Sequence, residues 1–221
     1  MQLFDRLKTD CQIEWSAYVN HPFVSGLGDG SLSEASFRHY LVQDYLFLIQ
    51  FARAYGLAAY KASTLADIRA ATEGLKAIID VEMDLHVTLC AKWGLSPQDL
   101  ENAPEARATM AYTRFVLETG MSGDLLDLHT ALAPCVIGYG EIAKELAGHE
   151  SGVSEDNPYA FWIAEYSGAE YQQVARDAGG HLDQLAESYL TEARYARLKS
   201  IFASATRLEA DFWQMGVTLA D

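Results

Sequence analysis

LLDLHTALAPCVIGYGE, residues 125–141, combines an apolar helical pattern with residues that helices usually avoid. Its leucines predict a buried helix from about residue 123 to residue 147. The second half of the stretch nevertheless contains Pro134, Cys135, Gly138, Tyr139 and Gly140. Proline lacks the N–H of a helical hydrogen bond, and each glycine lowers helix stability by about 1 kcal/mol relative to alanine. We therefore expect a ligand or a neighbouring helix to approach this stretch closely.

Helical periodicity also dominates the chain before this stretch. One helical face is predicted near the N-terminus by Leu3, Leu7, Cys11, Trp15 and Tyr18, which are spaced three or four residues apart. The glycine-rich segment GLGDG, residues 26–30, predicts a loop. Ser31 and Glu34 predict a capping box that opens a long helix ending near residue 62.

The remaining segments follow the same pattern. We expect a helix at about 67–93, ended by a left-handed Gly94, and a short helical turn that begins at Pro97. Further helices are expected at about 104–118, 159–166, 170–189 and 192–219. No segment shows the sustained alternation that is typical of β-strands. The predicted fold class is all-α, a compact multi-helix bundle.

Composition and charge limit the classes of function. The 221 residues are 50% hydrophobic, which is enough for one large core, so a single domain at 1–221 is expected. The net charge of -15 disfavours nucleic acids and anionic membranes as partners. Three widely spaced cysteines disfavour a disulfide framework or a structural zinc site. Without a signal peptide or a membrane-spanning run, the expected location is cytoplasmic.

Cys135, Asp44 and Glu209 stand out as candidates for chemistry. Cys135 and Tyr139 are four residues apart and share a helix face. Asp44 falls on an apolar stripe, where it could pair with an arginine such as Arg53 or Arg114, or face a pocket. Glu209 borders an apolar face; it could be a solvated residue at the helix edge, or a buried acid with a raised pKa that donates a proton.

A carboxylate and a histidine in EMDLH, Glu82 and His86, share a helix face and could in principle bind a metal. No matching pair occurs on another helix, so an ion pair or hydrogen bond between them is the favoured interpretation. We expect no metal site and no cofactor. His129, the histidine nearest to Cys135 in sequence, does not share its helix face.

Taken in chain order, several blocks resemble the thiaminase II family, also called TenA, in its cysteine-containing branch. The blocks are HPF, FRHYLVQDYLF, EMDLHVTLCAKWGL, AYTRF, ALAPCVIGYGEI, NPYAFWIAEYSG and LEADFW, and they span nearly the whole chain. The resemblance implies a haem-oxygenase-like all-α fold and a homotetramer. It also implies hydrolysis at an aminopyrimidine, either an aminomethylpyrimidine salvaged from degraded thiamin or thiamin itself.

The resemblance also implies roles for individual residues. The nucleophile corresponds to Cys135 and the acidic residue near the C-terminus to Glu209. The residues expected to bind the pyrimidine are Asp44, Phe47, Tyr112, Tyr139 and Tyr166. Phe47 departs from the tyrosine that many members have there, so the ring can stack but its hydroxyl is missing. The base that deprotonates Cys135 is left open.

Two other functions remain open at this stage. The first is a metal- or haem-dependent oxidoreductase on the same fold, motivated by Glu82, His86 and the other histidines. The second is a non-catalytic regulatory protein, which the net charge of -15 and the lack of a basic helical stripe disfavour as a direct DNA binder.

Overall fold

The structure is a computed structural model that describes residues 2–221. Within that range the chain is helical and contains no β-strand, which confirms the predicted fold class. The elements are α1 (Leu3–Asp10), α2 (Gln12–Val19), α3 (Pro22–Asp29), α4 (Glu34–Lys61), α5 (Leu65–Ala77), η1 (Ile78–Glu82), α6 (Met83–Ala91), α7 (Pro97–Glu101), α8 (Arg107–Ser122), α9 (Leu125–Ala147), η2 (Glu150–Val153), α10 (Ala160–Ser167), α11 (Ala169–Tyr189) and α12 (Glu192–Thr218). Among these described residues, no helix is both long enough and apolar enough to cross a membrane.

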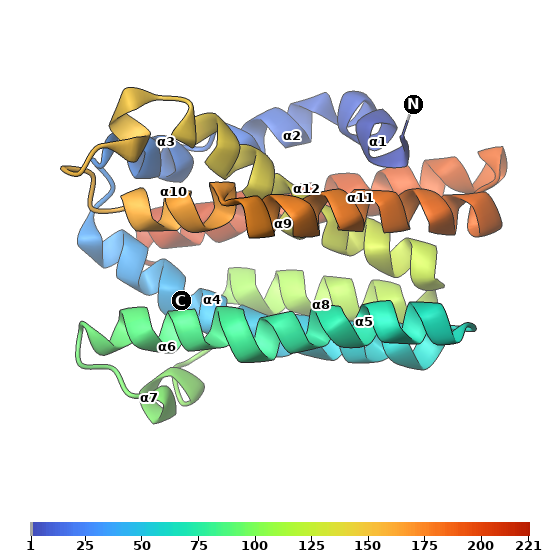
Figure 1. The fold of residues 1–221 in the computed structure, drawn as a ribbon, viewed down its shortest axis with the longest axis horizontal. Helices are drawn as coiled ribbons and strands as arrows, with labels where there is room; N and C mark the ends of the chain where they lie inside the picture. Colours follow the sequence, from blue (N-terminus) through green and yellow to red (C-terminus); the bar gives the residue numbers. More distant parts are fainter. Residues whose placement is uncertain (1) are drawn as a thin grey trace.

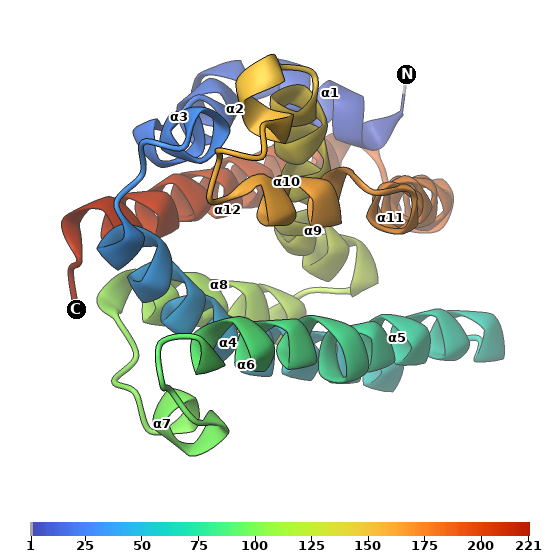
Figure 2. The ribbon, with the colours of Figure 1, turned by 60° about the vertical axis from the view of Figure 1, so that its left-hand side comes forward.

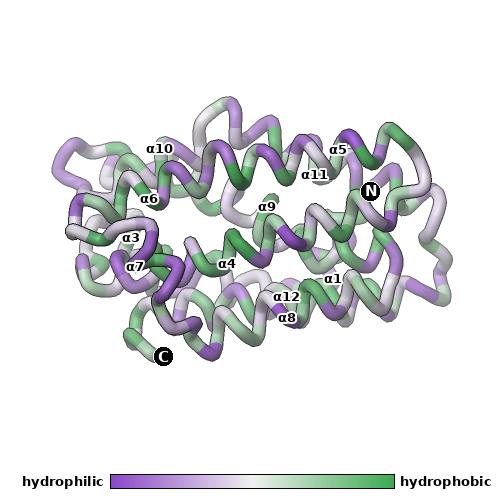
Figure 3. The backbone as a smooth tube through the Cα atoms, turned by 90° about the horizontal axis from the view of Figure 1, so that it is seen from below, coloured by the Kyte–Doolittle hydropathy of each residue, from purple (hydrophilic) through white to green (hydrophobic). Residues whose placement is uncertain are grey.

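The helices form two layers that lie side by side (Figures 1 and 2). One layer contains α4, α8 and a continuous rod made of α5, η1 and α6, with the short α7 at its edge. The other contains α9 to α12, and α1 to α3 cover its outer side. The layers meet where α8 and α4 contact α9 and α12. Hydrophobic and hydrophilic turns alternate along the helices in Figure 3, as this two-layer packing requires.

The bounds of the helix that contains residues 125–141 agree closely with the prediction from sequence. α9 begins at Leu125, and the preceding Asp124 forms a capping box with Asp127. The helix passes through Pro134 without ending. At Gly138 the helix α9 approaches α2 closely, because a Cβ built there would lie 2.6 Å from the ring of Tyr18 on α2. The glycine is therefore explained by the contact with a neighbouring helix.

Two local predictions are wrong. The cap of α4 is Ser33, which accepts from the Ser36 backbone N–H, rather than Ser31 with Glu34. GLGDG is not a loop, because α3 continues to Asp29 and only Gly30 has a left-handed φ of 77°. The glycine at 28 allows close packing, since a Cβ there would lie 2.7 Å from the end of the Leu146 side chain on α9, which would have to shift.

The apolar face predicted near the N-terminus is confirmed, although the helix that carries it breaks at Cys11 to give α1 and α2. The segment predicted at 67–93 is likewise helical, but it contains the π-helical turn η1, which periodicity did not indicate. Gly94 ends this rod with a φ of 73°. π-Helical turns occur frequently at functional sites.

Candidate active site

A cavity of about 50 Å³ lies where the two layers face each other, lined by side chains of α4, the α5–η1 rod, α9, α10 and α11. A space of this size holds a few water molecules. The predicted site residues that line it are Asp44, Phe47, Cys135, Tyr139 and Tyr166. Helices from both layers and distant parts of the chain therefore bring these side chains together.

The other two predicted residues, Tyr112 and Glu209, lie directly behind this cavity. Each is only 1% exposed, and the Tyr112 hydroxyl donates to Glu209 Oε1 at 2.8 Å. The Glu209 carboxyl also interacts with the Cys135 thiol. A solvated position for Glu209 is thus wrong, because α12 is covered on several sides, by α2, α4, α8 and α9.

Burial sets the protonation states of this thiol and this acid. Burial raises the pKa of Glu209 to about 8, although the hydrogen bond from Tyr112 opposes the rise. Burial also raises the pKa of the Cys135 thiol well above its ordinary value, and the negative charge of Glu209 adds to that rise. The resting site therefore holds a protonated thiol beside a carboxyl that exchanges its proton near neutral pH.

Asp44 is paired, but not with an arginine. Its Oδ2 atom lies 2.7 Å from His86 Nε2 and accepts a hydrogen bond of 3.1 Å from the Tyr40 hydroxyl. The two arginines suggested from sequence bind elsewhere: Arg53 donates to Gln50, and Arg114 pairs with Glu105. Among residues 2–221, no hydrogen-bond partner is described for the other oxygen, Oδ1, and Asp44 itself lines the cavity.

The protonation of His86 follows from its two contacts. Its Nδ1 atom lies 2.7 Å from the backbone oxygen of Glu82, which can only accept, so Nδ1 carries a proton. Burial lowers the pKa of His86, but the hydrogen bond and the charge of Asp44 outweigh burial and leave the pKa raised. The raised pKa favours the charged form of His86, and the contact between the two side chains holds Asp44 in one orientation.

Aromatic rings form the walls of the cavity. Phe47 contacts Tyr112, with ring centroids 5.1 Å apart, and the rings of Tyr139 and Tyr166 are 5.3 Å apart. Phe47 lines the cavity with a ring that carries no hydroxyl, as expected from the sequence. These flat surfaces suit a flat heteroaromatic ring, which packs against aromatic side chains in offset or edge-to-face arrangements.

His86 and Glu82 do not form the metal pair considered from sequence. Both ring nitrogens of His86 are occupied by Asp44 and by the backbone, so the ring cannot also ligate an ion. The expected link between Glu82 and His86 exists, but it uses the backbone oxygen of Glu82 and leaves its carboxylate facing the cavity. In the described part of the chain, no group of three or more potential ligands is suitably placed for a metal ion.

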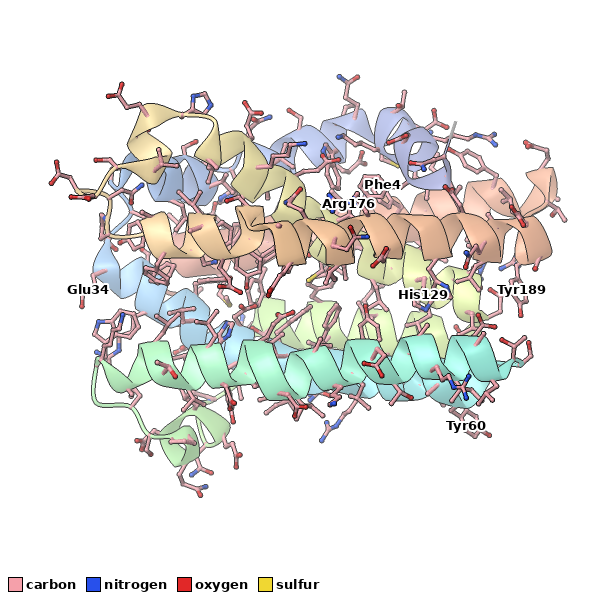
Figure 4. The ribbon with its side chains drawn as sticks, viewed as in Figure 1. Phe4, Glu34, Tyr60, His129, Arg176 and Tyr189 are labelled. Atoms are coloured by element: carbon pink, nitrogen blue, oxygen red, sulfur yellow. The ribbon has the colours of Figure 1, made fainter. Side chains whose placement is uncertain are left out.

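His129 is also separate from the cavity, as its helix position predicted. It lies between the two layers (Figure 4), where its ring contacts Tyr55 and His181. Burial, together with the positive charge of the neighbouring His181, lowers the pKa of His129 to about 3. A neutral imidazole that binds protons so weakly, and faces other side chains, is a poor base for Cys135.

Sequence reasoning missed several residues at the cavity. On α4, Phe51 and Tyr55 continue the stripe of Asp44 and Phe47 in steps of four, so helical spacing alone could have found them. Tyr171 also lines the cavity, but it follows a helix break at Gly168. No spacing relates residues across such a break, so only the folded chain shows this contact.

Comparison with known proteins first identifies the class of fold. A domain of unknown function with a heme oxygenase-like fold from Shewanella denitrificans superposes with a TM-score of 0.74 at 12% identity, covering 98% of this chain and 92% of the other. The two-layer all-α bundle is thus haem-oxygenase-like.

The particular family follows from the sequence. The model of the TENA/THI-4/PQQC family matches residues 10–219, and the chain belongs to this family. It is 43% identical to a TenA family transcription regulator from Silicibacter sp. TM1040, with a TM-score of 0.93 over 98% of this chain and 97% of that one. It is also 39% identical to an aminopyrimidine aminohydrolase from Halalkalibacterium halodurans, over 91% of this chain and 89% of the relative.

Proposed function

We propose that this chain is an aminopyrimidine aminohydrolase of thiamin salvage. Its substrate would be 4-amino-5-aminomethyl-2-methylpyrimidine, which it would convert to the hydroxymethyl compound and ammonia; thiamin would be a second substrate, cleaved to pyrimidine and thiazole. One observation carries the proposal: Cys135 lines an aromatic-walled cavity and lies close enough to the buried Glu209 carboxyl for each group to shift the pKa of the other. The similarity to an aminopyrimidine aminohydrolase supports the same reaction.

Each residue has a chemical role in this proposal. Asp44, held by His86, accepts a hydrogen bond from the exocyclic amine of the pyrimidine through its unpaired oxygen. Phe47, Tyr139 and Tyr166 enclose the ring, while Tyr112 holds Glu209. These contacts fix the ring against Cys135, and such positioning is a large part of the rate enhancement of an enzyme.

The reaction begins with proton transfer between neighbouring groups. Protonated Glu209 donates to a ring nitrogen through one oxygen, while its other oxygen takes the thiol proton of Cys135, so the acid ends the step protonated. The thiolate sulfur adds to a ring carbon, and the electron pair displaced from the ring is held by the protonated nitrogen. Glu209 is the acid in contact with the thiol, so this route supplies the base that the sequence left open.

The remaining steps exchange the leaving group for water. The C–N bond of the protonated aminomethyl group breaks, the nitrogen leaves with the bonding electrons as ammonia, and an exocyclic methylene remains. Water adds to that carbon and gives up a proton. The C–S bond then breaks, the ring nitrogen returns its proton, and the aromatic ring is restored with Cys135 free. The sum is one water consumed and one ammonia released.

The test offers aminomethylpyrimidine and thiamin side by side and measures hydroxymethylpyrimidine by chromatography. We expect product from wild type and a loss of at least about a hundredfold in Cys135→Ser and in Glu209→Gln, because nucleophile and proton transfer each contribute on that scale. Cys11→Ser is the matched control, since Cys11 lies in the break between α1 and α2 and its Sγ faces the Lys199 backbone oxygen. Full activity in Cys135→Ser would falsify the nucleophile assignment.

We also propose that the chain is one domain at 1–221 and assembles as a homotetramer in the cytoplasm. Its ligand would be a small pyrimidine, and neither nucleic acid nor a membrane would be a partner. Exposed apolar side chains on α5, Leu65 and Ile68, support burial of that face in an oligomer. Light scattering of the purified protein measures the subunit number. Gel-shift binding to DNA at physiological salt would instead support a regulatory function.

A further inference from the structure

The carboxylate of Glu82 is a feature of the cavity that the proposed reaction does not use. Glu82 lines the cavity opposite α9, and no hydrogen-bond partner for its carboxylate is described within residues 2–221. Burial is the main reason for the raised pKa values of Tyr55, Tyr166 and Tyr171, and the charge of Glu82 adds to each. These tyrosines belong to α4, α10 and α11, so the carboxylate faces a space that three helices share.

The π-helical turn η1 determines the direction in which the Glu82 side chain points. Gly74, Ile78, Glu82 and His86 are four residues apart; the first three line the cavity, and His86 contacts Asp44. In a regular α-helix such a row drifts around the axis by about 40° per step. The wider turn of η1, at Ile78–Glu82, offsets that drift and keeps the row on one side of the rod. Glu82 therefore points inward because of η1.

The charges in the cavity favour a positive ligand. His86 pairs with Asp44, and the Tyr112 hydroxyl donates to Glu209, whereas within residues 2–221 no partner is described for the carboxylate of Glu82, which lines the cavity. Among the described residues that line the cavity, none is a lysine or an arginine. Burial raises the pKa of Glu82 to about 7, and the charge of His86 partly opposes this rise. A cation placed beside Glu82 would stabilise its ionised form.

Position indicates which part of a substrate would carry that cation. Cys135 lies against the fully buried Glu209, whereas Glu82 shares its rod with the exposed Ala77, which also lines the cavity. Val174, 47% exposed, lines the same region from α11. A pyrimidine with its ring at Cys135 would therefore direct its substituent towards Glu82 and the solvent-facing side.

We infer that Glu82 is a specificity-determining residue that binds the positively charged substituent of the pyrimidine, the group that leaves during hydrolysis. That group is an ammonium in aminomethylpyrimidine and a thiazolium in thiamin; both carry a positive nitrogen on the methylene carbon. The inference rests on the proposed function for the identity of the ligand. The hydroxymethyl product is neutral, so Glu82 does not retain it.

The experiment measures binding without turnover. In a Cys135→Ser background, calorimetry at pH 8 gives the Kd of cationic aminomethylpyrimidine and of neutral hydroxymethylpyrimidine. Adding Glu82→Gln should weaken binding of the cation by about tenfold or more, because a charge-assisted hydrogen bond usually contributes on that scale. The same substitution should change binding of the neutral ligand by less than about twofold. Asp84→Asn, an exposed acid two residues further on, is the matched control and should change neither value.

Two outcomes would overturn the inference. One is an unchanged ratio of the two Kd values in a folded Glu82→Gln variant. The other is Glu82→Asp, which keeps the charge, losing as much of the preference as Glu82→Gln. Turnover by wild type is measured in a separate assay, and absence of hydroxymethylpyrimidine there would contradict the proposed hydrolysis. The role of Glu82 is decided by the ratio of the two Kd values alone.

Discussion

Glu209 shows how burial changes the chemistry of a single side chain. In sequence it borders an apolar face, and its spacing does not separate a solvated acid from a buried one. In the structure it is enclosed, hydrogen-bonded to Tyr112 and close enough to Cys135 for the thiol to affect its pKa. The pKa of about 8 that results lets one carboxyl both donate and accept a proton near neutral pH.

The same burial predicts how stability depends on pH. Glu209 binds its proton more tightly in the folded chain than in the unfolded chain, so the folded state holds more protons between about pH 5 and pH 8. The contribution of Glu209 to stability is therefore present at low pH and is lost as pH rises towards 8. Glu209→Gln removes this dependence, so relative to wild type it should gain stability between pH 5 and pH 8, on the order of a few kcal/mol.

Urea unfolding of both proteins at several pH values measures this difference. Glu187→Gln on α11 is the control, because Glu187 is exposed and its substitution should give a small difference at every pH. A difference between Glu209→Gln and wild type that is constant from pH 5 to pH 8 would show that Glu209 titrates like an exposed acid.

At the scale of elements, α9 is positioned by close contacts that its sequence only suggests. The glycine at 138 admits the fully buried ring of Tyr18, and Gly140 lies against Gln172 and Ala175 of α11. Tyr18 also donates to the backbone oxygen of Pro134 at 3.3 Å. These contacts place α9 between α2 and α11, and with it Cys135 at the cavity.

Gly138→Ala tests this packing. The new Cβ would lie 2.6 Å from Tyr18 Cε1 and 2.9 Å from its hydroxyl, and the enclosed ring has little room to move. We expect a loss of about 1–3 kcal/mol in the free energy of unfolding, the usual effect of overpacking a core. Gly180→Ala on α11 is the matched control, since nothing lies within 4 Å of its new Cβ. That control should instead gain up to about 1 kcal/mol from better helix propensity. Denaturant midpoints of the two variants, moving in opposite directions, would confirm the contact at residue 138.

At the scale of the molecule, the cavity exists only because two layers are held together. Its lining comes from α4 and the α5–η1 rod on one side and from α9, α10 and α11 on the other. Buried apolar and aromatic side chains fill this junction. Because both layers share this core, we expect neither to be stable alone.

Cooperative unfolding is the consequence to measure. Trp93 follows α6 and donates to Glu34 of α4, whereas the other tryptophans, Trp15, Trp162 and Trp213, belong to the opposite layer. Fluorescence of wild type and of Trp93→Phe, together with far-ultraviolet circular dichroism, should give one shared urea midpoint. Separate midpoints would mean that the layers unfold independently, against a single domain at 1–221.

The sequence by itself determined the helices and the residue types at the site. Helical periodicity and capping are local properties, so the bounds of α9, α11 and α12 follow closely from spacing. Position on a helix, together with the family resemblance, singled out Cys135 and Asp44 as candidates. Errors arose where packing overrides local preference, as with the glycines of α3, or where a π-helical turn shifts the register, as in η1.

Only the tertiary structure decided the electrostatics of the cavity. It paired Asp44 with His86 rather than with an arginine, enclosed Glu209, and directed Glu82 inward. These contacts join residues 42 and 97 positions apart, so no periodicity in the sequence can indicate them. Burial and neighbouring charges then set each pKa, and both depend on atoms that come together only when the two layers pack.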